Sequence, residues 1–326
     1  MHRRAVISDI HANLPALDAV LSDIAAQQVD DIVCLGDICG YGPQPVECIA
    51  RVRGVAKWTL LGNHDEAVFK EPIDFSRNAY DAIVWQRTVL DPAKLSSPGP
   101  ADVERWEWLK SLEPSRTDKS VRYVHASPRD PIHEYVLKED FDESCGGPTD
   151  AGRKQLEAID WLCFCGHSHR PGVVAEDYRW WLPEELPEGR CMLRPGFKTI
   201  VNVGSVGQPR DGHPEACYAI FEYDPNKDLG ASQSGIRPSA ASLIAGARDP
   251  STTMVLTRPD LLPIGNDEET RGEKDRELQE ARKTVILLTP KVHFRRVPYD
   301  IHAAQTRFFA IPDLPRYNGI RLMTGK

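Results

Sequence analysis

The sequence predicts a layered α/β fold, with a largely parallel sheet in its first half and antiparallel strands that complete a second sheet. Three observations carry this prediction. Over residues 1–170, short β-branched runs alternate with segments of helical periodicity, which is typical of parallel sheets covered by helices. After residue 198 the apolar segments are strand-like. Asp, Asn or His side chains follow the expected strands of the first half at five strand ends.

Residues 3–62 are expected to form three strands separated by two helices. The run RRAVIS (3–8) is a short β-branched strand, and Asn13 can cap the helix that follows it. Apolar residues of that helix, which spans 13–28, recur at helical spacing: Leu14, Leu17, Leu21 and Ile24. The next segments are the strand DIVCLG (31–36), the helix PQPVECIARVR (43–53) and the strand AKWTLLG (56–62).

The same alternation continues to residue 166. Helical patterns at 77–90 and 102–112 precede a fourth strand, SVRYVH (120–125). A helix at 149–159, TDAGRKQLEAI, then leads into the apolar strand WLCFCG (161–166). Five strands and their helices therefore fill the first half of the chain.

The second half is β-rich apart from one polar stretch. The expected strands are KTIVNVGS (198–205), ACYAIFEYD (216–224) and a long segment at 283–300. Residues 226–283 are rich in Pro, Ser, Gly, Asp and Glu, so we expect an acidic, partly disordered surface insertion within a single domain that spans 1–326. A partner protein, if the chain has one, is expected to bind this insertion.

Composition excludes several classes of function. The net charge is -8 without a long basic run, which argues against non-specific nucleic-acid binding. No apolar run approaches the roughly 20 residues that a membrane helix needs, and Asp9 interrupts the first apolar stretch before a signal-peptide core can form. Cysteines such as Cys34 and Cys163 lie in expected buried strands. We therefore expect reduced thiols and a cytoplasmic protein.

Polar side chains follow each of the five strands at the end where parallel strands share an edge. They are Asp9, His11, Asp37, Asn63, His64, Asp65, His125, His167 and His169. Taken singly, each has an ordinary structural explanation, such as a helix cap, a turn or a structural histidine. Their recurrence at one edge, where open α/β folds bind ligands, favours a functional site.

Two Asp, one Asn and four His form a set of metal ligands. Seven donors exceed the three or four that one open catalytic zinc site uses, so we expect two divalent ions roughly 3.5 to 4 Å apart with one bridging carboxylate. The nitrogen-rich set favours manganese, iron, zinc, cobalt or nickel over magnesium or calcium, and leaves these five open. Such a site carries excess positive charge and should attract an anion. Hydrolysis of a small phosphorylated substrate is the expected chemistry.

Five ordered blocks resemble the signature of the calcineurin-like metallophosphoesterase superfamily. They are SDIH, LGDICGYGP, LLGNHDEAV, YVHASPRDP and FCGHSHRPG. Within the superfamily the chain is most similar to the small prokaryotic phosphodiesterases and diadenosine-tetraphosphatase-related proteins. The resemblance covers 1–225 and 284–312, and it implies a four-layer α-β-β-α sandwich made of two mixed sheets flanked by helices.

The resemblance also implies a role for each residue of the site. One metal would be held by Asp9, His11, Asp37 and His169, and the second by Asp37, Asn63, His125 and His167. Asp37 would be the bridge. A metal-bridging hydroxide would attack a phosphate mono- or diester in line, while His64, oriented by Asp65, protonates the leaving oxygen.

The chain departs from the pattern of the phosphoprotein phosphatases in this superfamily. Gly40, Tyr41 and Gly42 stand where those enzymes carry Asp-Arg-Gly, whose arginine helps to hold phosphate. Arg129 and Arg170 are candidate substrate contacts in its place, although a surface or salt-bridge role is open for both. The alternative functions are a phosphoprotein phosphatase, a dinucleotide-polyphosphate phosphatase, or a metal-binding scaffold without turnover.

Overall fold

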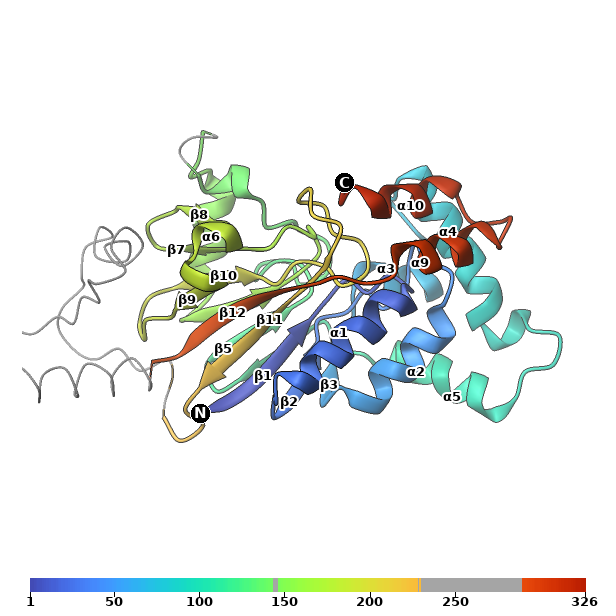
Figure 1. Cartoon of the computed structure of the whole chain (residues 1–326), viewed down its shortest axis with the longest axis horizontal. Helices are drawn as coiled ribbons and strands as arrows, with labels where there is room; N and C mark the ends of the chain where they lie inside the picture. The colour runs from blue at the N-terminus through green and yellow to red at the C-terminus, as the bar shows by residue number, and fades with distance from the viewer. Residues whose placement is uncertain (143–145, 228, 230–288) are drawn as a thin grey trace, which may run out of the picture.

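The computed structural model describes residues 1–142, 146–227, 229 and 289–326. In this part of the chain, two mixed sheets of six strands each are flanked by helices (Figure 1). The predicted α/β sandwich is confirmed. Most of the expected insertion at 226–283 lies outside the described residues, so its partial disorder and its role stay predictions.

The first sheet has the strand order β3-β2-β1-β11-β12-β9. Strands β1, β2 and β3 are parallel to one another, whereas β11, β12 and β9 join by antiparallel pairing. The bounds are β1 His2–Ile7, β2 Asp31–Cys34, β3 Trp58–Thr59, β9 Arg190–Met192, β11 Ala216–Tyr223 and β12 Lys291–Val297. The parallel half of this sheet carries the first three polar strand ends.

The second sheet has the order β4-β5-β6-β10-β7-β8. Here β5, β6 and β10 are parallel, and β4, β7 and β8 pair antiparallel at the two sides. The bounds are β4 Ser115–Asp118, β5 Val121–Val124, β6 Leu162–Cys165, β7 Gly172–Ala175, β8 Trp180–Trp181 and β10 Thr199–Asn202. The strands β4, β7, β8 and β9 were not predicted.

The helices begin close to the expected residues. The side chain of Asn13 accepts a hydrogen bond from the backbone N–H of Ala16 at 3.3 Å, as a capping residue should. The α-helices are α1 Leu14–Ala26, α2 Pro45–Val55, α3 Asn63–Phe69, α4 Arg77–Leu90, α5 Pro100–Lys110, α6 Asp150–Glu157, α9 Ile301–Phe309 and α10 Arg316–Ile320. Single-turn 3-10 helices are η1 Pro92–Lys94, η2 Lys138–Asp140, η4 Pro183–Glu185, η5 Pro187–Gly189 and η8 Arg321–Met323.

Alternation along the strands sorts the core into layers. In β1, Ala5 and Ile7 pack with residues of α1 and α2, whereas Val6 packs between the sheets with Phe164 and Val201 of the second sheet. On the outer face of the second sheet, α6 covers apolar residues of β6 and β10. The layers therefore run helix, sheet, sheet, helix. The ends of the parallel strands of both sheets lie at one edge of this sandwich.

The last residues of the chain form a segment that no sequence motif explained. Helices α9 and α10 lie beside α4 (Figure 1), and Phe308, Leu314 and Leu322 pack with Ala82 of α4 in a separate apolar cluster. The side-chain amide of Asn318 donates to the backbone carbonyl of Asn78 at 3.3 Å. The 3-10 helix η8 is thereby brought near the strand ends.

The cysteines and the helix lengths of the described residues bear on two further expectations. Its cysteines are all free, and all except Cys191 are buried, in agreement with the expected reduced thiols. None of the described helices has both the length and the apolar character that a membrane crossing requires.

Candidate metal centre

The parallel strand ends of both sheets bring the predicted ligand residues together. Asp9 and His11 follow β1, Asp37 follows β2 and Asn63 begins α3 after β3. His125 follows β5 in the other sheet. His167 and His169 follow β6, which is parallel to β5. All of these residues except Asn63, which is partly buried, are at most 5% exposed.

The loops that carry these side chains have unusual backbone conformations. Five of the seven candidate ligands have positive φ angles: Asp9 54°, His11 49°, Asp37 51°, His167 63° and His169 59°. A side chain in the left-handed region costs free energy, on the order of 1 kcal/mol or more per residue. The fold accepts this cost at five positions around one point, which is typical of a functional site.

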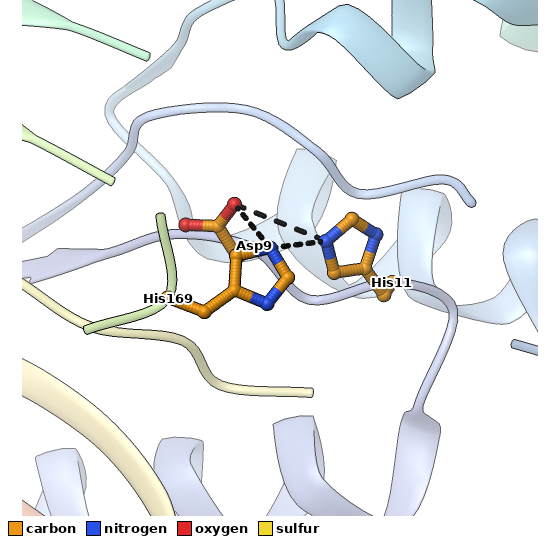
Figure 2. A group of neighbouring side chains, drawn as sticks. All are labelled: Asp9, His11 and His169. Atoms are coloured by element: carbon orange, nitrogen blue, oxygen red, sulfur yellow. Dashed lines mark hydrogen bonds and ion pairs between the residues drawn. The ribbon is translucent and has the colours of Figure 1, made fainter. Parts of the chain in front are cut away.

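Asp9, His11 and His169 form the first group (Figure 2). The Nε2 atom of His169 lies 3.2 Å from Oδ1 of Asp9 and 3.1 Å from Nε2 of His11. The Nε2 atom of His11 lies 3.8 Å from the same carboxylate oxygen. Three donor atoms therefore converge on one point.

Asp37, His125 and His167 form the second group. The Nε2 atom of His125 lies 3.4 Å from Oδ2 of Asp37 and 3.1 Å from Oδ1 of Asn63. The amide oxygen of Asn63 thus adds a fourth donor to this group. The structure brings together all seven residues that the sequence predicted as ligands.

The carboxylate of Asp37 lies between the two groups. Its Oδ1 accepts a hydrogen bond from the backbone N–H of His64 at 2.9 Å. Its Oδ2 is buried without a hydrogen-bond partner and lies 3.6 Å from Nε2 of His11 and 3.4 Å from Nε2 of His125. A carboxylate oxygen that has no hydrogen-bond partner and lies between two sets of ligands is suitably placed to bridge two metal ions.

Backbone carbonyls fix three of the imidazole rings. The Nδ1 of His11 donates to the carbonyl of Cys39 at 2.9 Å, and the Nδ1 of His169 donates to that of Gln208 at 2.6 Å. The Nε2 of His167 donates to the carbonyl of His133 at 3.1 Å, which leaves its Nδ1 for the site. Metal-ligating histidines ordinarily hold their second nitrogen in this way.

Burial favours the uncharged forms of both the histidines and the carboxylates of this site. Burial lowers the pKa of His125 and of His167 to about 3, so both rings are neutral at physiological pH. Burial raises the pKa of Asp9, and that of Asp37 is raised further by the neighbouring Asp65 and Asp9. The charge of Arg210 lowers the pKa of both carboxylates, but the net shift is upward, and divalent cations would stabilise the ionised forms.

The donors fit a pair of divalent cations. With both Nδ1 atoms donating to carbonyls, the Nε2 lone pairs of His11 and His169 face each other at 3.1 Å. Two facing lone pairs repel unless a cation lies between them. The first group would hold one ion and the second group the other, with Asp37 shared.

His64 lies beside the ligands and closes the site on the side of α3. Its ring contacts the rings of His11 at a centroid distance of 4.8 Å, Tyr41 at 4.6 Å and Phe75 at 4.9 Å. The Nδ1 atom is buried without a hydrogen-bond partner. Burial and the charge of Arg210 lower the pKa of His64 well below its ordinary value.

Asp65 does not orient the His64 ring, so that expectation is corrected. Its Oδ1 accepts from the backbone N–H of Cys39 at 2.8 Å, and its Oδ2 accepts from that of Gly62 at 3.3 Å. Asp65 is the third residue of α3, and its side chain turns back toward the start of the helix. It joins the loop that carries Asp37 to the loop that carries His64.

A cavity of about 720 Å³ opens beside the metal ligands. His64, Asn63 and His167 line it, and two arginines, Arg210 and Arg321, complete its wall. Neither Arg129 nor Arg170, the candidate substrate contacts, is among the lining residues.

Both of those candidates pair with glutamates instead. Arg129 lies 3.3 Å from Glu134, and Arg170 lies 3.4 Å from Glu139. Both guanidinium side chains are more than a third exposed. The structure thus favours the salt-bridge role that the sequence left open for them.

Sequence reasoning missed both cavity arginines. Arg210 lies in the loop after β10, whose end shares the edge of β6. The strand-end rule, applied to residues 198–205, would have pointed to this loop. Arg321 lies in a tail that carried no recognisable pattern, so only the folded chain reveals it.

The chain is similar to several known proteins. A model of the calcineurin-like phosphoesterase family matches residues 2–171. An uncharacterized protein of Methanocaldococcus jannaschii is 38% identical over 225 residues, which are 67% of this chain and 82% of that protein. A metallophosphoesterase from Sphaerobacter thermophilus has a crystal structure with a TM-score of 0.65 and 29% identity, covering 100% of this chain and 99% of that one. A hypothetical protein from Pyrococcus horikoshii shares the fold at a TM-score of 0.58 and 16% identity, with the same coverage.

Proposed function

Because the chain belongs to the calcineurin-like phosphoesterase family, we propose that it hydrolyses phosphate esters with the help of two divalent transition-metal ions. The observation that carries this proposal is the unpartnered Oδ2 of Asp37 between two groups of ligands. Bound divalent ions would stabilise the negative charge of the phosphoryl group and activate water at neutral pH. The nitrogen-rich donor set favours manganese, iron, cobalt, nickel or zinc.

The protein residues around the site would orient the substrate and move one proton. His64 is the candidate general acid, and its Nε2 is the ring nitrogen that lies away from Gly40. Its pKa is lowered in the free site, so the ring needs the negative charge of a bound phosphate ester to raise the pKa toward neutrality. The proton on Nε2 would then pass to the leaving oxygen.

A panel of esters tests this proposal. Protein stripped with a chelator should hydrolyse none of four esters: 4-nitrophenyl phosphate, bis(4-nitrophenyl) phosphate, a phosphopeptide and diadenosine tetraphosphate. Adding back manganese, nickel or zinc should restore hydrolysis of at least one of them, whereas magnesium and calcium should not. The ester that is hydrolysed fastest would choose between monoester, diester, phosphoprotein and dinucleotide specificity.

Two outcomes of the panel would contradict the proposal. Unchanged hydrolysis by the stripped protein would exclude a metal-dependent reaction. Binding of about two ions without hydrolysis of any ester would instead support the scaffold function that the sequence left open.

Gly40 is expected to be required for the position of His64. A Cβ atom at residue 40 would lie 2.3 Å from Nδ1 of His64, and Gly40 has a φ of 93°. The variant Gly40→Ala should therefore displace the ring and lower kcat roughly ten- to a hundredfold, with the metal content unchanged. The matched control is Gly54→Ala in α2, where an added Cβ has nothing within 4 Å. Equal kcat values for the two variants would contradict the role of His64.

A further inference from the structure

Two guanidinium groups face the cavity from segments that lie outside the matched residues 2–171. Arg210 comes from the loop after β10 and Arg321 from η8 near the end of the chain. Both are only partly exposed. The cavity wall therefore carries two positive charges in addition to the metal ligands, and neither arginine was assigned a role from the sequence.

Arg210 is held directly beside the metal ligands. Its backbone N–H donates to the carbonyl of His169 at 3.2 Å. Its side chain donates to the hydroxyl of Tyr41 at 3.0 Å and to Oε1 of Gln208 at 2.9 Å. The Nε atom is buried without a hydrogen-bond partner in the described chain, so one donor of this guanidinium is not satisfied by the protein.

Arg321 reaches the same cavity because the end of the chain is tied to the loop of Arg210. The backbone N–H of Gly212 donates to the carbonyl of Gly325 at 2.8 Å, and Leu322 is buried against Phe308. The Arg321 guanidinium lies 5.6 Å from the ring centroid of Tyr317. Its pKa is lowered by burial and by the charge of Arg210, which lines the same cavity.

Neither arginine is paired with a side-chain carboxylate among the described residues, although Asp74 also lines the cavity. The Nε atom of Arg321 donates to the backbone oxygen of Lys326 at 2.5 Å, and the charge of Arg210 lowers the pKa of Asp9 and of Asp37. By contrast, the exposed Arg129 and Arg170 both have glutamate partners. Two partly buried cations without a paired carboxylate side chain favour a ligand that supplies negative charge.

The amount of positive charge indicates the class of ligand. Two divalent ions with Asp9, Asp37 and a bridging hydroxide would leave about one positive charge, and the two arginines would bring the total to about three. A phosphate monoester carries at most two negative charges. A substrate with a second phosphate group matches the remaining charge.

Resting on the proposed hydrolysis, we propose that Arg210 and Arg321 form a clamp for phosphate esters that carry a second phosphate group. Arg210, which is bonded to the ligand residue His169, would contact the scissile phosphate. Arg321, which lies on the tail beyond Arg210, would contact the second phosphate. The C-terminal segment would thus determine substrate specificity.

Calorimetric binding of inorganic phosphate and pyrophosphate tests the clamp. With metal-loaded protein at a fixed free metal concentration, Arg321→Ala should weaken pyrophosphate binding roughly ten- to a hundredfold. Phosphate binding should change by less than about threefold, because Arg210 remains in place. The control Arg316→Ala removes the same charge from an exposed position of the same segment, where the guanidinium lies 4.7 Å from the ring centroid of Phe309. It should leave both affinities unchanged.

Three results would overturn the clamp: no loss of pyrophosphate affinity, an equal loss for both anions, or an equal effect of Arg316→Ala. Arg321→Gln is a second variant, in case Arg321→Ala disturbs the packing of the tail. It removes the charge but keeps most of the side-chain length, and it should show the same loss of pyrophosphate affinity. Calorimetry does not depend on turnover. If the protein hydrolyses none of the four esters, the proposed function is refuted, whereas the clamp is tested by the calorimetric affinities alone.

Discussion

Replacing Asp37 with asparagine is expected to lower the metal content from about two ions per chain to well below one. The reason is that Oδ2 of Asp37 lies between the two groups of ligands, so both sites lose a negatively charged donor. Hydrolysis should fall on the order of a thousandfold or more, because several kcal/mol of charge stabilisation disappear with the ions. Elemental analysis after dialysis, together with kcat, measures both effects.

Asp9→Asn is the matched comparison for this variant. Asp9 is an equally buried carboxylate, but the donor atoms grouped with it are those of His11 and His169, and its contact with His167 is to the backbone N–H of that residue. This variant should retain about one ion per chain, held by the second group. If Asp37→Asn and Asp9→Asn lose the same number of ions, Asp37 is not the shared ligand.

Replacing His64 with alanine is expected to keep both ions and to lower kcat by roughly a hundred- to ten-thousandfold. The imidazole lies within reach of His11 and Asp37, but the two predicted sets of four donors are complete without it. The loss should be larger for phenyl phosphate than for 4-nitrophenyl phosphate, since a poor leaving group depends more strongly on protonation. Steady-state kinetics on the two esters measures this difference.

His133→Ala provides the control for the histidine experiment. His133 lines the same cavity, but its imidazole is more than half exposed and pairs with Glu66 and Asp130. The group that orients His167 is the backbone carbonyl of His133, which the substitution keeps. The kcat values of this control on both esters should be close to those of the wild-type protein. A loss in His64→Ala that is the same for both leaving groups would refute proton donation.

The fold was predictable where periodicity and strand direction decide it. Alternation in β1 sends Ala5 and Ile7 to the helices and Val6 to the second sheet, and this pattern is visible in the sequence. Parallel strands share an edge, so polar residues at their ends had to meet. The seven ligand candidates were found for this reason.

The fine structure of the site was not predictable, because it depends on backbone conformation. No local pattern indicated the positive φ angles of Asp9, Asp37 or His167. The carbonyls that orient His11 and His169 belong to Cys39 and Gln208, which are remote from those histidines in sequence. Such contacts exist only once the loops have packed.

The arginines that line the cavity were also not predicted from the sequence. Nearness in sequence suggested Arg129 and Arg170, but both side chains point to glutamate partners on the surface. Arg210 and Arg321 lie far from the ligands along the chain and reach the cavity through tertiary contacts. Nearness in sequence to a ligand therefore does not identify a substrate contact.

If Asp37 joins two metal sites in one centre, its replacement should empty both, and this can be measured as the metal content of Asp37→Asn beside that of His64→Ala. We expect about two ions per chain in His64→Ala and well below one in Asp37→Asn. Two ions retained in Asp37→Asn, with hydrolysis at the wild-type rate, would contradict this expectation.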